Sequence, residues 1–240
     1  MLAHSTLSVV VPAYNEAENI PILFEEVRSV LSRLNRDWEI LFIDDCSTDE
    51  TLPTLRRLAN EHPELRYLSF ERNCGQSAGF SAGFQAARGE VIITMDADLQ
   101  NDPGDIPLML ERFGQGADMV IGWRARRQDT WAKRMASLLA NRVRNALTRE
   151  NVRDTGCSLK VLRADLARRI PMFTGMHRFL PTLMRLEGAR VVEIKVNHRP
   201  RRHGTSKYGV LDRALATWQD LLAVRWMQKR HIRYALREHN

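Results

Sequence analysis

The stretch Val91-Ile92-Ile93-Thr94-Met95-Asp96-Ala97-Asp98-Leu99-Gln100 decides the fold, because an apolar run typical of a β-strand leads directly into paired carboxylates. Residues two apart in an extended segment share one face, so Asp96 and Asp98 can approach one cation, with the Gln100 amide oxygen as a third ligand. A solvated turn is the structural alternative for an isolated Asp-x-Asp pair. The segment therefore indicates a strand whose exit suits a divalent cation bound to a nucleotide diphosphate.

The first half of the chain alternates short apolar runs with amphipathic stretches. We predict strands at Leu7–Val11, Glu39–Ile43, Leu65–Phe70, Val91–Met95 and Met119–Ile121, and helices near 17–34, 50–61, 77–88 and 105–113. This alternation predicts an α/β fold with a parallel, doubly wound sheet. Such sheets bind ligands at the carboxyl ends of their strands, so the residues that follow each strand are the candidates for function.

Polar segments follow four of the predicted strands, at Pro12–Glu16, Asp44–Asp49, Asp96–Gln100 and Gly122–Arg124. Helix capping explains Thr48 or Asp49. It does not explain the adjacent carboxylates Asp44 and Asp45, which repel each other unless a ligand or a donor compensates, so we expect one of them to bind a base or ribose. The glycine-rich run at 75–84 lets a helix start close to a ligand, but its spacing and position differ from the dinucleotide-binding fingerprint.

Composition sets the outer limits of the interpretation. A chain of 240 residues with 44% hydrophobic residues can bury a full core. The N-terminal lead has no signal-peptide pattern, and no apolar run reaches the roughly 18 residues of a spanning helix, so we expect a soluble or peripherally attached protein. Cys46, Cys74 and Cys157 share no paired spacing, which argues against a disulfide framework or a zinc knuckle and favours the cytosol.

The charge is distributed unevenly. Residues 1–122 carry 9 Lys and Arg against 20 Asp and Glu, whereas residues 123–240 carry 27 against 9. An acidic half suits metal and ribose binding, and a basic half suits the phosphates of a diphosphate, a lipid headgroup or a nucleic acid. A solvated basic surface is the alternative for single Arg residues. The dense patches at 124–134 and 199–207 favour phosphate binding.

Six segments, in order along the chain, resemble the family 2 glycosyltransferases that act on polyprenyl phosphates, such as dolichyl-phosphate mannose synthases and bacterial undecaprenyl-phosphate sugar transferases. They are Val11–Glu16, Asp44–Asp49, Asn73–Gln76, Asp96–Pro103, Asp154–Cys157 and Gly204–Tyr208. The resemblance runs from about residue 7 to about residue 210. The chain departs from the family at Cys46, where glycine is usual, and it lacks the paired membrane helices of many bacterial members.

The resemblance implies a GT-A fold, with a Rossmann-like, mostly parallel sheet and C-terminal amphipathic helices. The catalytic domain would be 1–208, and a basic amphipathic helix and tail would be 209–240. The nucleotide would be held by Pro12, Tyr14, Glu16, Asp44, Asp45, Gly75, Gln76, Asp96 and Ala97, and Mg²⁺ or Mn²⁺ by Asp96, Asp98 and Gln100. Donor or acceptor phosphates would meet Arg124, Lys133, Arg134, Arg201, Arg202, Ser206 and Lys207. The catalytic set would be Asp96, Asp98, Arg124 and Asp154.

The implied reaction is direct displacement at the anomeric carbon by a lipid-phosphate oxygen, with inversion. A phosphate monoester has a second pKa near about 6, so the nucleophile is already ionised and needs no strong base. The metal and cationic side chains would neutralise the departing diphosphate. Asp154 would orient the acceptor or a basic side chain, and His177, His198 and His203 are expected to be surface or packing residues. A uridine donor is favoured, and guanosine with mannose remains open.

A lipid acceptor requires contact with a membrane. Segment 209–230 has apolar residues at helical spacing beside Arg and Lys, which suits an anionic interface at the cytoplasmic face of the membrane; packing on the body or on another subunit is the alternative. The stretch 131–147 is a second candidate, for which core packing is equally expected. A second copy or a membrane protein remains open as partner.

Two other classes of function were compared with this one. A nucleic-acid binder should interleave aromatic and basic residues, and this chain does not. A catalytically silent nucleotide-sugar-binding scaffold would not need the intact set of Asp96, Asp98 and Gln100.

Overall fold

The computed structural model describes residues 6–124, 142, 144–148, 152–200 and 210–232, with the backbone alone for 210–217. In chain order the elements are β1 (Leu7–Ala13), α1 (Asn19–Leu31), β2 (Trp38–Asp44), α2 (Thr51–Glu61), β3 (Leu65–Ser69), α3 (Gln76–Ala86), β4 (Val91–Thr94), η1 (Pro103–Asp105), α4 (Ile106–Gly114), β5 (Met119–Trp123), β6 (Lys160–Arg163), α6 (Ala164–Ala167), η2 (Met176–Phe179), α7 (Leu180–Leu186), β7 (Val191–Lys195) and α8 (Val210–Arg230). The five predicted strands and four predicted helices of the first half are all confirmed, with bounds that shift by up to three residues.

The strands form one seven-stranded sheet in the order β3-β2-β1-β4-β6-β5-β7. The pairs β1–β2, β1–β4, β2–β3 and β5–β7 are parallel. Strand β6 runs antiparallel to both of its neighbours, β4 and β5. The predicted mostly parallel sheet is therefore confirmed, and the reversed strand β6 means that residues preceding it lie at the same edge as residues following β4 and β5.

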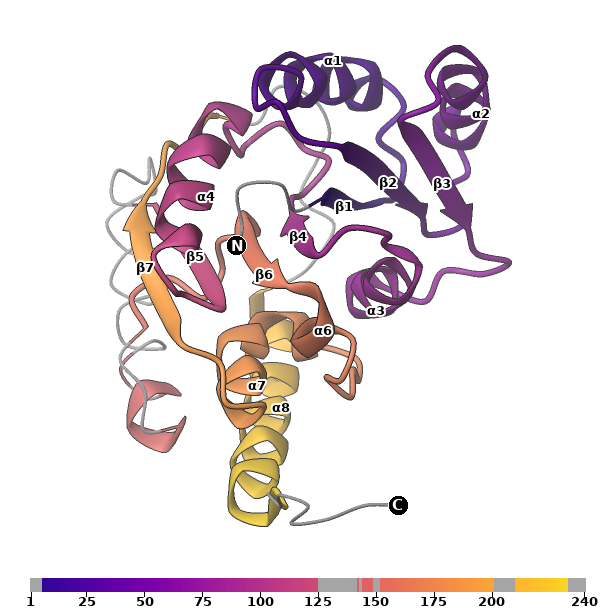
Figure 1. The fold of residues 1–240 in the computed structure, drawn as a ribbon. Helices are drawn as coiled ribbons and strands as arrows, with labels where there is room; N and C mark the ends of the chain where they lie inside the picture. The colour runs from indigo at the N-terminus through magenta and orange to yellow at the C-terminus, as the bar shows by residue number, and fades with distance from the viewer. Residues whose placement is uncertain (1–5, 125–141, 143, 149–151, 201–209, 233–240) are drawn as a thin grey trace, which may run out of the picture.

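Helices cover both faces of the sheet, as the doubly wound prediction requires. Helices α1, α2 and α4 lie on one side and α3, α6 and α7 on the other (Figure 1). Side chains alternate between the two layers along each strand: Val9 and Val11 of β1 pack with the first group, and Val10 packs with the second. Burial on both faces explains why the strands are almost continuously apolar.

Helix α3 lies unusually close to the centre of the sheet. A Cβ atom added to Gly83 would lie 2.3 Å from Val10 Cγ1, so only glycine lets the helix approach β1 this closely. The glycine-rich run predicted to bring a helix near a ligand therefore also serves helix–sheet packing. The consequence is that the N-terminus of α3, at Gln76, lies beside the end of β4.

Helix α8 confirms the helix predicted within 209–230, and it lies beside α7 (Figure 1). Leu221 and Val224 are buried against the second core layer. Trp218, Leu222 and Trp226 point outward and are 49%, 48% and 64% exposed. The helix thus packs on the body along one side and leaves an apolar side uncovered.

No helix within the described ranges is both long and apolar enough to span a bilayer. Most of the candidate segment 131–147 lies outside the described residues. In the part that is described, Arg144 is buried and Leu147 packs against the second core layer, which agrees with core packing there.

Candidate functional site

The loops after β1 and β2 are joined by hydrogen bonds into one rim. The Asn15 backbone N–H donates to Ser47 Oγ at 2.9 Å, and the Thr48 N–H donates to Asn15 Oδ1 at 2.8 Å. The Glu16 N–H donates to Thr51 Oγ1 at 2.9 Å. The N-cap of α2 is Glu50, and neither Thr48 nor Asp49 occupies that position. Asp49 Oδ1 accepts from the N–H of Thr51, the first residue of α2, at 3.0 Å, and Thr48 joins the two loops.

The turn at Cys46 explains why glycine suits this position. Cys46 has φ +60°, in the left-handed region where glycine is favoured. Its thiol donates to the Glu71 carbonyl at 3.6 Å. The turn that the sequence left uncertain is therefore left-handed, and cysteine occupies it.

The adjacent carboxylates of Asp44 and Asp45 are buried and bonded to the protein itself. Asp44 accepts from the Ser47 N–H at 3.1 Å and from Ser69 Oγ at 2.7 Å. Asp45 accepts from the N–H groups of Cys74 and Gly75, at 2.6 and 2.8 Å. Four donors thus offset the repulsion between the two groups, and binding of either to a base or ribose stays a prediction.

The other predicted nucleotide residues lie around the same rim. Pro12, Tyr14 and Glu16 are half-buried beside β1, and Ala97 is buried. Gly75 precedes α3 with φ +83°. Gln76 donates its side-chain amide to Asp96 Oδ1 at 2.6 Å, so within the structure it holds the Asp-x-Asp segment. Binding of these residues to a nucleotide is an untested prediction.

Asp96 and Asp98 lie together at the carboxyl end of β4. Asp98 is 7% exposed and accepts from the Gln100 N–H at 3.2 Å. Burial, and next the charge of Asp98, raise the pKa of Asp96 above its ordinary value. A carboxylate whose charge is disfavoured by burial and by a neighbouring carboxylate is one that a nearby cation stabilises.

The donor set fits Mg²⁺ or Mn²⁺ of the kind that also binds substrate phosphate. Within the described part of the chain, no group of three or more His, Cys, Asp and Glu side chains could hold a metal ion by itself. Mg²⁺ commonly takes one or two protein carboxylates and completes its coordination with phosphate oxygens and water. Asp96 and Asp98 suit that mode, and the Gln100 side chain remains a predicted third ligand.

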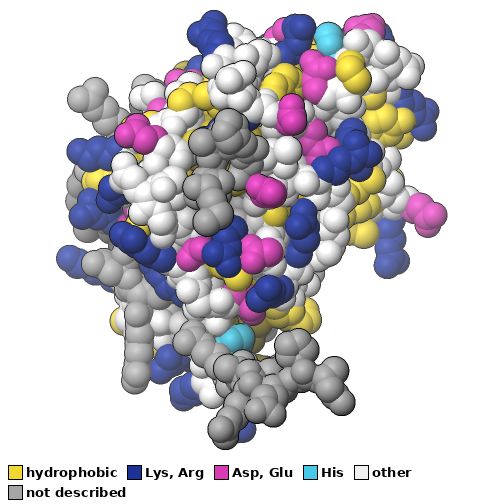
Figure 2. Space-filling model, viewed as in Figure 1, with side chains coloured by type: hydrophobic (Ala, Val, Ile, Leu, Met, Phe, Trp, Pro, Cys, Tyr) yellow, Lys and Arg dark blue, Asp and Glu magenta, His cyan; other side chains and the backbone are white. Residues whose placement is uncertain are grey.

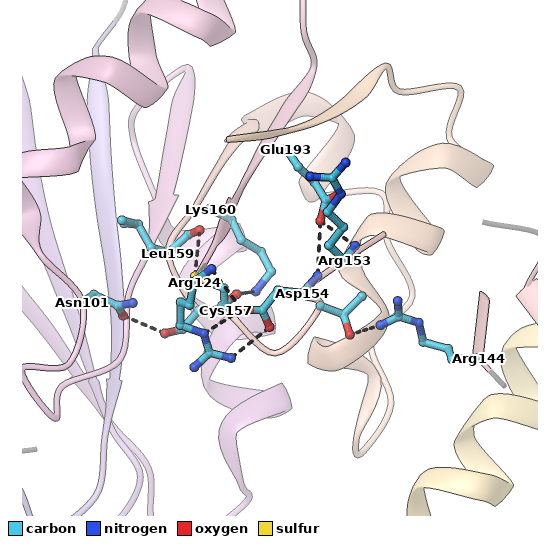
Figure 3. Close-up of polar contacts among 11 residues, drawn as sticks. Asn101, Arg124, Arg144, Arg153, Asp154, Cys157, Leu159, Lys160 and Glu193 are labelled. Carbon is cyan, nitrogen blue, oxygen red and sulfur yellow. Dashed lines mark hydrogen bonds and ion pairs between the residues drawn. The ribbon is translucent and has the colours of Figure 1, made fainter. Parts of the chain in front are cut away.

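The reversed strand β6 brings a second charged group to this edge. Arg124 follows β5, and Asp154 lies in the segment before β6. The Arg124 guanidinium donates to both Asp154 oxygens, from Nε at 2.8 Å and from Nη2 at 3.0 Å (Figure 3). Burial opposes the charge of Arg124, but Asp154 outweighs it and raises the pKa of Arg124, so the side chain is a fixed cation.

Lys160, which our sequence analysis did not identify, is buried in the same place. Its Nζ donates to the Cys157 carbonyl (Figure 3). Burial lowers its pKa from the ordinary value, while Cys157, Asp96 and Asp154 oppose that change. Burial also raises the pKa of Cys157 to about 11, so this thiol is neutral at neutral pH.

Asn101, also missed, ties three segments together. Its Oδ1 accepts from the Asp96 N–H at 3.3 Å and from Ser158 Oγ at 2.7 Å. Asn101 also forms an isolated antiparallel bridge with His198. His198 directly precedes the predicted phosphate-binding patch at 199–207, so the chain enters this patch from beside the Asp-x-Asp loop. Acidic and basic side chains intermingle across the middle of the face shown in Figure 2.

Two of the three predicted histidines, His177 and His198, lie in the described part of the chain. His177 is half-buried, and its Nδ1 lies 2.8 Å from Ser77 Oγ, which agrees with a packing role. His198 is half-buried as well. The remaining predicted residues lie outside the described part of the chain: Lys133, Arg134, Arg201, Arg202, His203, Ser206 and Lys207.

Residues 8–171 match the family model for glycosyl transferase family 2. The chain belongs to this family. A dodecaprenyl-phosphate galacturonate synthase from Rhizobium johnstonii is 38% identical over 228 residues, which cover 93% of this chain and 67% of the relative. An undecaprenyl-phosphate 4-deoxy-4-formamido-L-arabinose transferase from Aeromonas hydrophila is 37% identical over 85% of this chain and 63% of its own length. This family 2 chain thus spans about two thirds of the length of these relatives.

Solved structures show that this family 2 member has the GT-A fold. Glucosyl-3-phosphoglycerate synthase from Mycobacterium tuberculosis, in complex with Mn²⁺, UDP and phosphoglyceric acid, has a TM-score of 0.71 and 20% identity, covering 97% of this chain and 81% of its own. A mannosyltransferase from Pyrobaculum calidifontis, in complex with GDP-mannose and Mn²⁺, has a TM-score of 0.65 and 19% identity, covering 97% and 66%. The predicted family and fold are both confirmed.

Proposed function

We propose that this chain is a metal-dependent, inverting glycosyltransferase that moves a sugar from a nucleoside-diphosphate sugar to a polyprenyl phosphate. The observation that carries the proposal is the pair of half-buried Asp96 and buried Asp98 at the end of β4, beside the fixed cation Arg124. Relatives named for transfer to dodecaprenyl and undecaprenyl phosphate support the acceptor class.

The donor and the metal follow from the same site. Asp96, Asp98 and Gln100 would hold Mg²⁺ or Mn²⁺, which when bound neutralises the diphosphate of the leaving group. Neighbours of the same fold were crystallised with Mn²⁺ and either UDP or GDP-mannose. We favour a uridine donor and keep GDP-mannose as the second candidate.

The reaction needs few protein groups. An oxygen of the acceptor phosphate forms the new bond to the anomeric carbon while the bond from that carbon to the diphosphate oxygen breaks, and the nucleoside diphosphate leaves. Since the acceptor phosphate is already largely ionised, no protein base has to remove a proton. Arg124 would stabilise the charge that develops on the leaving diphosphate.

Asp154 would act through Arg124 and not as a base. Both of its oxygens accept hydrogen bonds from the Arg124 guanidinium, and Oδ2 also accepts from the Arg124 N–H at 3.2 Å. A carboxylate engaged in this way fixes the direction of the cation. The neutral thiol of Cys157 offers no competing nucleophile, which agrees with single-step displacement and inversion.

Helix α8 would place the protein at the cytoplasmic surface of the membrane. Its exposed Trp218 and Trp226 lie on the same element as the exposed Lys229 and Arg230, and this combination suits the interface of an anionic bilayer. Binding to vesicles with and without phosphatidylglycerol tests this contact. We expect Trp218→Ala with Trp226→Ala to weaken binding about tenfold. Leu108→Ala, which removes an equally exposed apolar side chain from α4, is the matched control.

A donor screen tests the function itself. The protein is incubated with UDP- or GDP-sugars, a short-chain polyprenyl phosphate and Mn²⁺ or Mg²⁺, and the release of nucleoside diphosphate is measured. We expect release that needs both the acceptor and the metal. Donor binding without turnover would favour a silent scaffold, and undiminished turnover after chelation would remove the metal from the proposal.

A further inference from the structure

Lys160 occupies a position in the sheet directly behind the charged rim. It is the first residue of β6, and its register partners are Thr94 of β4 and Ile121 of β5. Thr94 is two residues before Asp96, and Ile121 is three before Arg124. Because β6 runs antiparallel to both neighbours, its first residue lies at the ligand edge of the sheet.

The side chain of Lys160 is buried among groups that can bind or attract an amine. The side chain is only 4% exposed, and burying an ammonium group is costly unless other groups offset the lost hydration. The Cys157 carbonyl accepts from Nζ, and the carboxylates of Asp96 and Asp154 attract the charge. Lys160 is therefore a buried amine that is bonded to the Cys157 carbonyl and lies near Asp154 and the predicted metal ligand Asp96.

In the segment from Asp154 to Lys160, both chain neighbours of Cys157 contact other parts of the protein. Thr94 Oγ1 donates to the Ser158 carbonyl at 2.6 Å. On the other side, Arg124 Nη2 lies so close to Gly156 that an added Cβ would be 3.1 Å from it. Lys160 holds the carbonyl between these two contacts, so its side chain fixes the backbone over which the Arg124 guanidinium lies.

We propose that Lys160 is a positioning residue of the diphosphate site, which holds the 154–158 segment so that Asp154 keeps Arg124 directed at the departing nucleoside diphosphate. Lys160 touches no substrate in this role, because its side chain is enclosed. The inference rests on the proposed function, since it assigns Lys160 to the site that binds a nucleoside diphosphate.

Three substitutions of Lys160 test its charge and its hydrogen-bond donor separately. Lys160→Met removes the charge and the donor at similar length, Lys160→Gln keeps a donor without charge, and Lys160→Arg keeps both. We expect Lys160→Met to weaken binding of UDP or GDP with Mn²⁺ about 10- to 100-fold, the usual range for a residue that orients a ligand-binding group. Lys160→Arg should restore most of the affinity and Lys160→Gln less.

Binding of Mn²⁺ alone distinguishes positioning from general damage. Lys160 is not a predicted metal ligand, and any positive charge on it would repel a metal ion, so its removal should not weaken Mn²⁺ binding measured by electron paramagnetic resonance without nucleotide. Nucleotide binding is measured by calorimetry, and thermal unfolding verifies the fold. Arg163→Met is the matched control, because Arg163 lies on the same strand with a largely exposed side chain that pairs with Asp118 and Asp165.

Each outcome decides the matter. Nucleotide affinity lost in Lys160→Met, restored in Lys160→Arg and unchanged in Arg163→Met supports the proposal. Wild-type affinity in Lys160→Met, equal losses in Lys160→Met and Lys160→Arg, or parallel loss of Mn²⁺ and nucleotide overturns it. A wild-type protein that binds neither UDP nor GDP with Mn²⁺ overturns the proposed function itself, and the role of Lys160 with it.

Discussion

Two pairs of carboxylates lie at the carboxyl ends of two strands of the same sheet, β2 and β4, but the groups that surround the two pairs differ. Asp44 and Asp45, after β2, accept four hydrogen bonds from the protein's own loops. After β4, burial and next the charge of Asp98 hold the pKa of Asp96 above its ordinary value. The first pair therefore holds the rim together, and at the second the disfavoured charge of Asp96 is one that the proposed metal ion would stabilise.

The strongest test of this difference is Asp98→Ala. We expect turnover to fall by about 10³-fold or more, because the site loses a ligand of the metal that neutralises the leaving group. Release of nucleoside diphosphate and Mn²⁺ binding are the measurements. Asp118→Ala, which removes a carboxylate that pairs with Arg163 far along the sheet, should leave both unchanged. Retained activity in Asp98→Ala would remove the metal assignment.

Asp154→Ala should have the next largest effect. Removing one partner of a buried ion pair leaves the Arg124 charge uncompensated, which costs about 3 kcal/mol of stability. Nucleotide affinity should fall as well, because the guanidinium loses its direction. Urea unfolding and calorimetry measure the two effects, and stability equal to the wild type would contradict the geometry of the pair.

Asp45→Ala should have the opposite effects to those expected for Asp98→Ala: it should lower stability and leave Mn²⁺ binding unchanged. The N–H groups of Cys74 and Gly75 lose their acceptor, so the free energy of unfolding should drop by about 2 kcal/mol. Mn²⁺ binding should stay at the wild-type level. If Asp45→Ala lost Mn²⁺ as completely as Asp98→Ala, the two pairs would not differ in the way described here.

The smallest expected effect is the change of stability with pH that arises from Asp96. A carboxyl group with a raised pKa contributes stability below its unfolded pKa and loses it as the pH rises through the folded value. Without metal, Asp96→Asn should therefore match the wild-type Tm near pH 4 and exceed it by a few degrees at pH 7.5. A constant difference across this range would contradict the raised pKa.

The sequence predicted the first five strands because each is an apolar run between turn residues, and it placed Asp96 and Asp98 correctly at a strand end. It missed β6 because Lys160–Arg163 is charged at both ends, and it missed β7 because Glu193 and Lys195 interrupt the apolar run. Lys160 was missed because β6 is antiparallel. Ligands bind at the carboxyl ends of parallel strands, so the sequence analysis considered residues after each strand and not the first residue of one.

Other features depend on packing that no local pattern encodes. The hydrogen bond from Gln76 to Asp96 exists because Gly83 lets α3 approach β1. The four donors to Asp44 and Asp45 come from residues 3 to 30 positions away along the chain. Sequence alone therefore placed these acidic residues at one edge of the sheet, but could not show which of them already accept hydrogen bonds from the fold itself.

The direction of β6 has a consequence for the stretch of chain between β5 and β6. Ile121 and Lys160 are register partners, and the Gly122 N–H donates to the Leu159 carbonyl at 3.0 Å, so the segment between them departs and returns at adjacent points. A stretch closed at its base in this way tolerates changes of length at small entropic cost. Arg124 and Asp154 both belong to this stretch, whereas Asp96 and Asp98 lie outside it, so a change in its length would leave the proposed cation ligands in place.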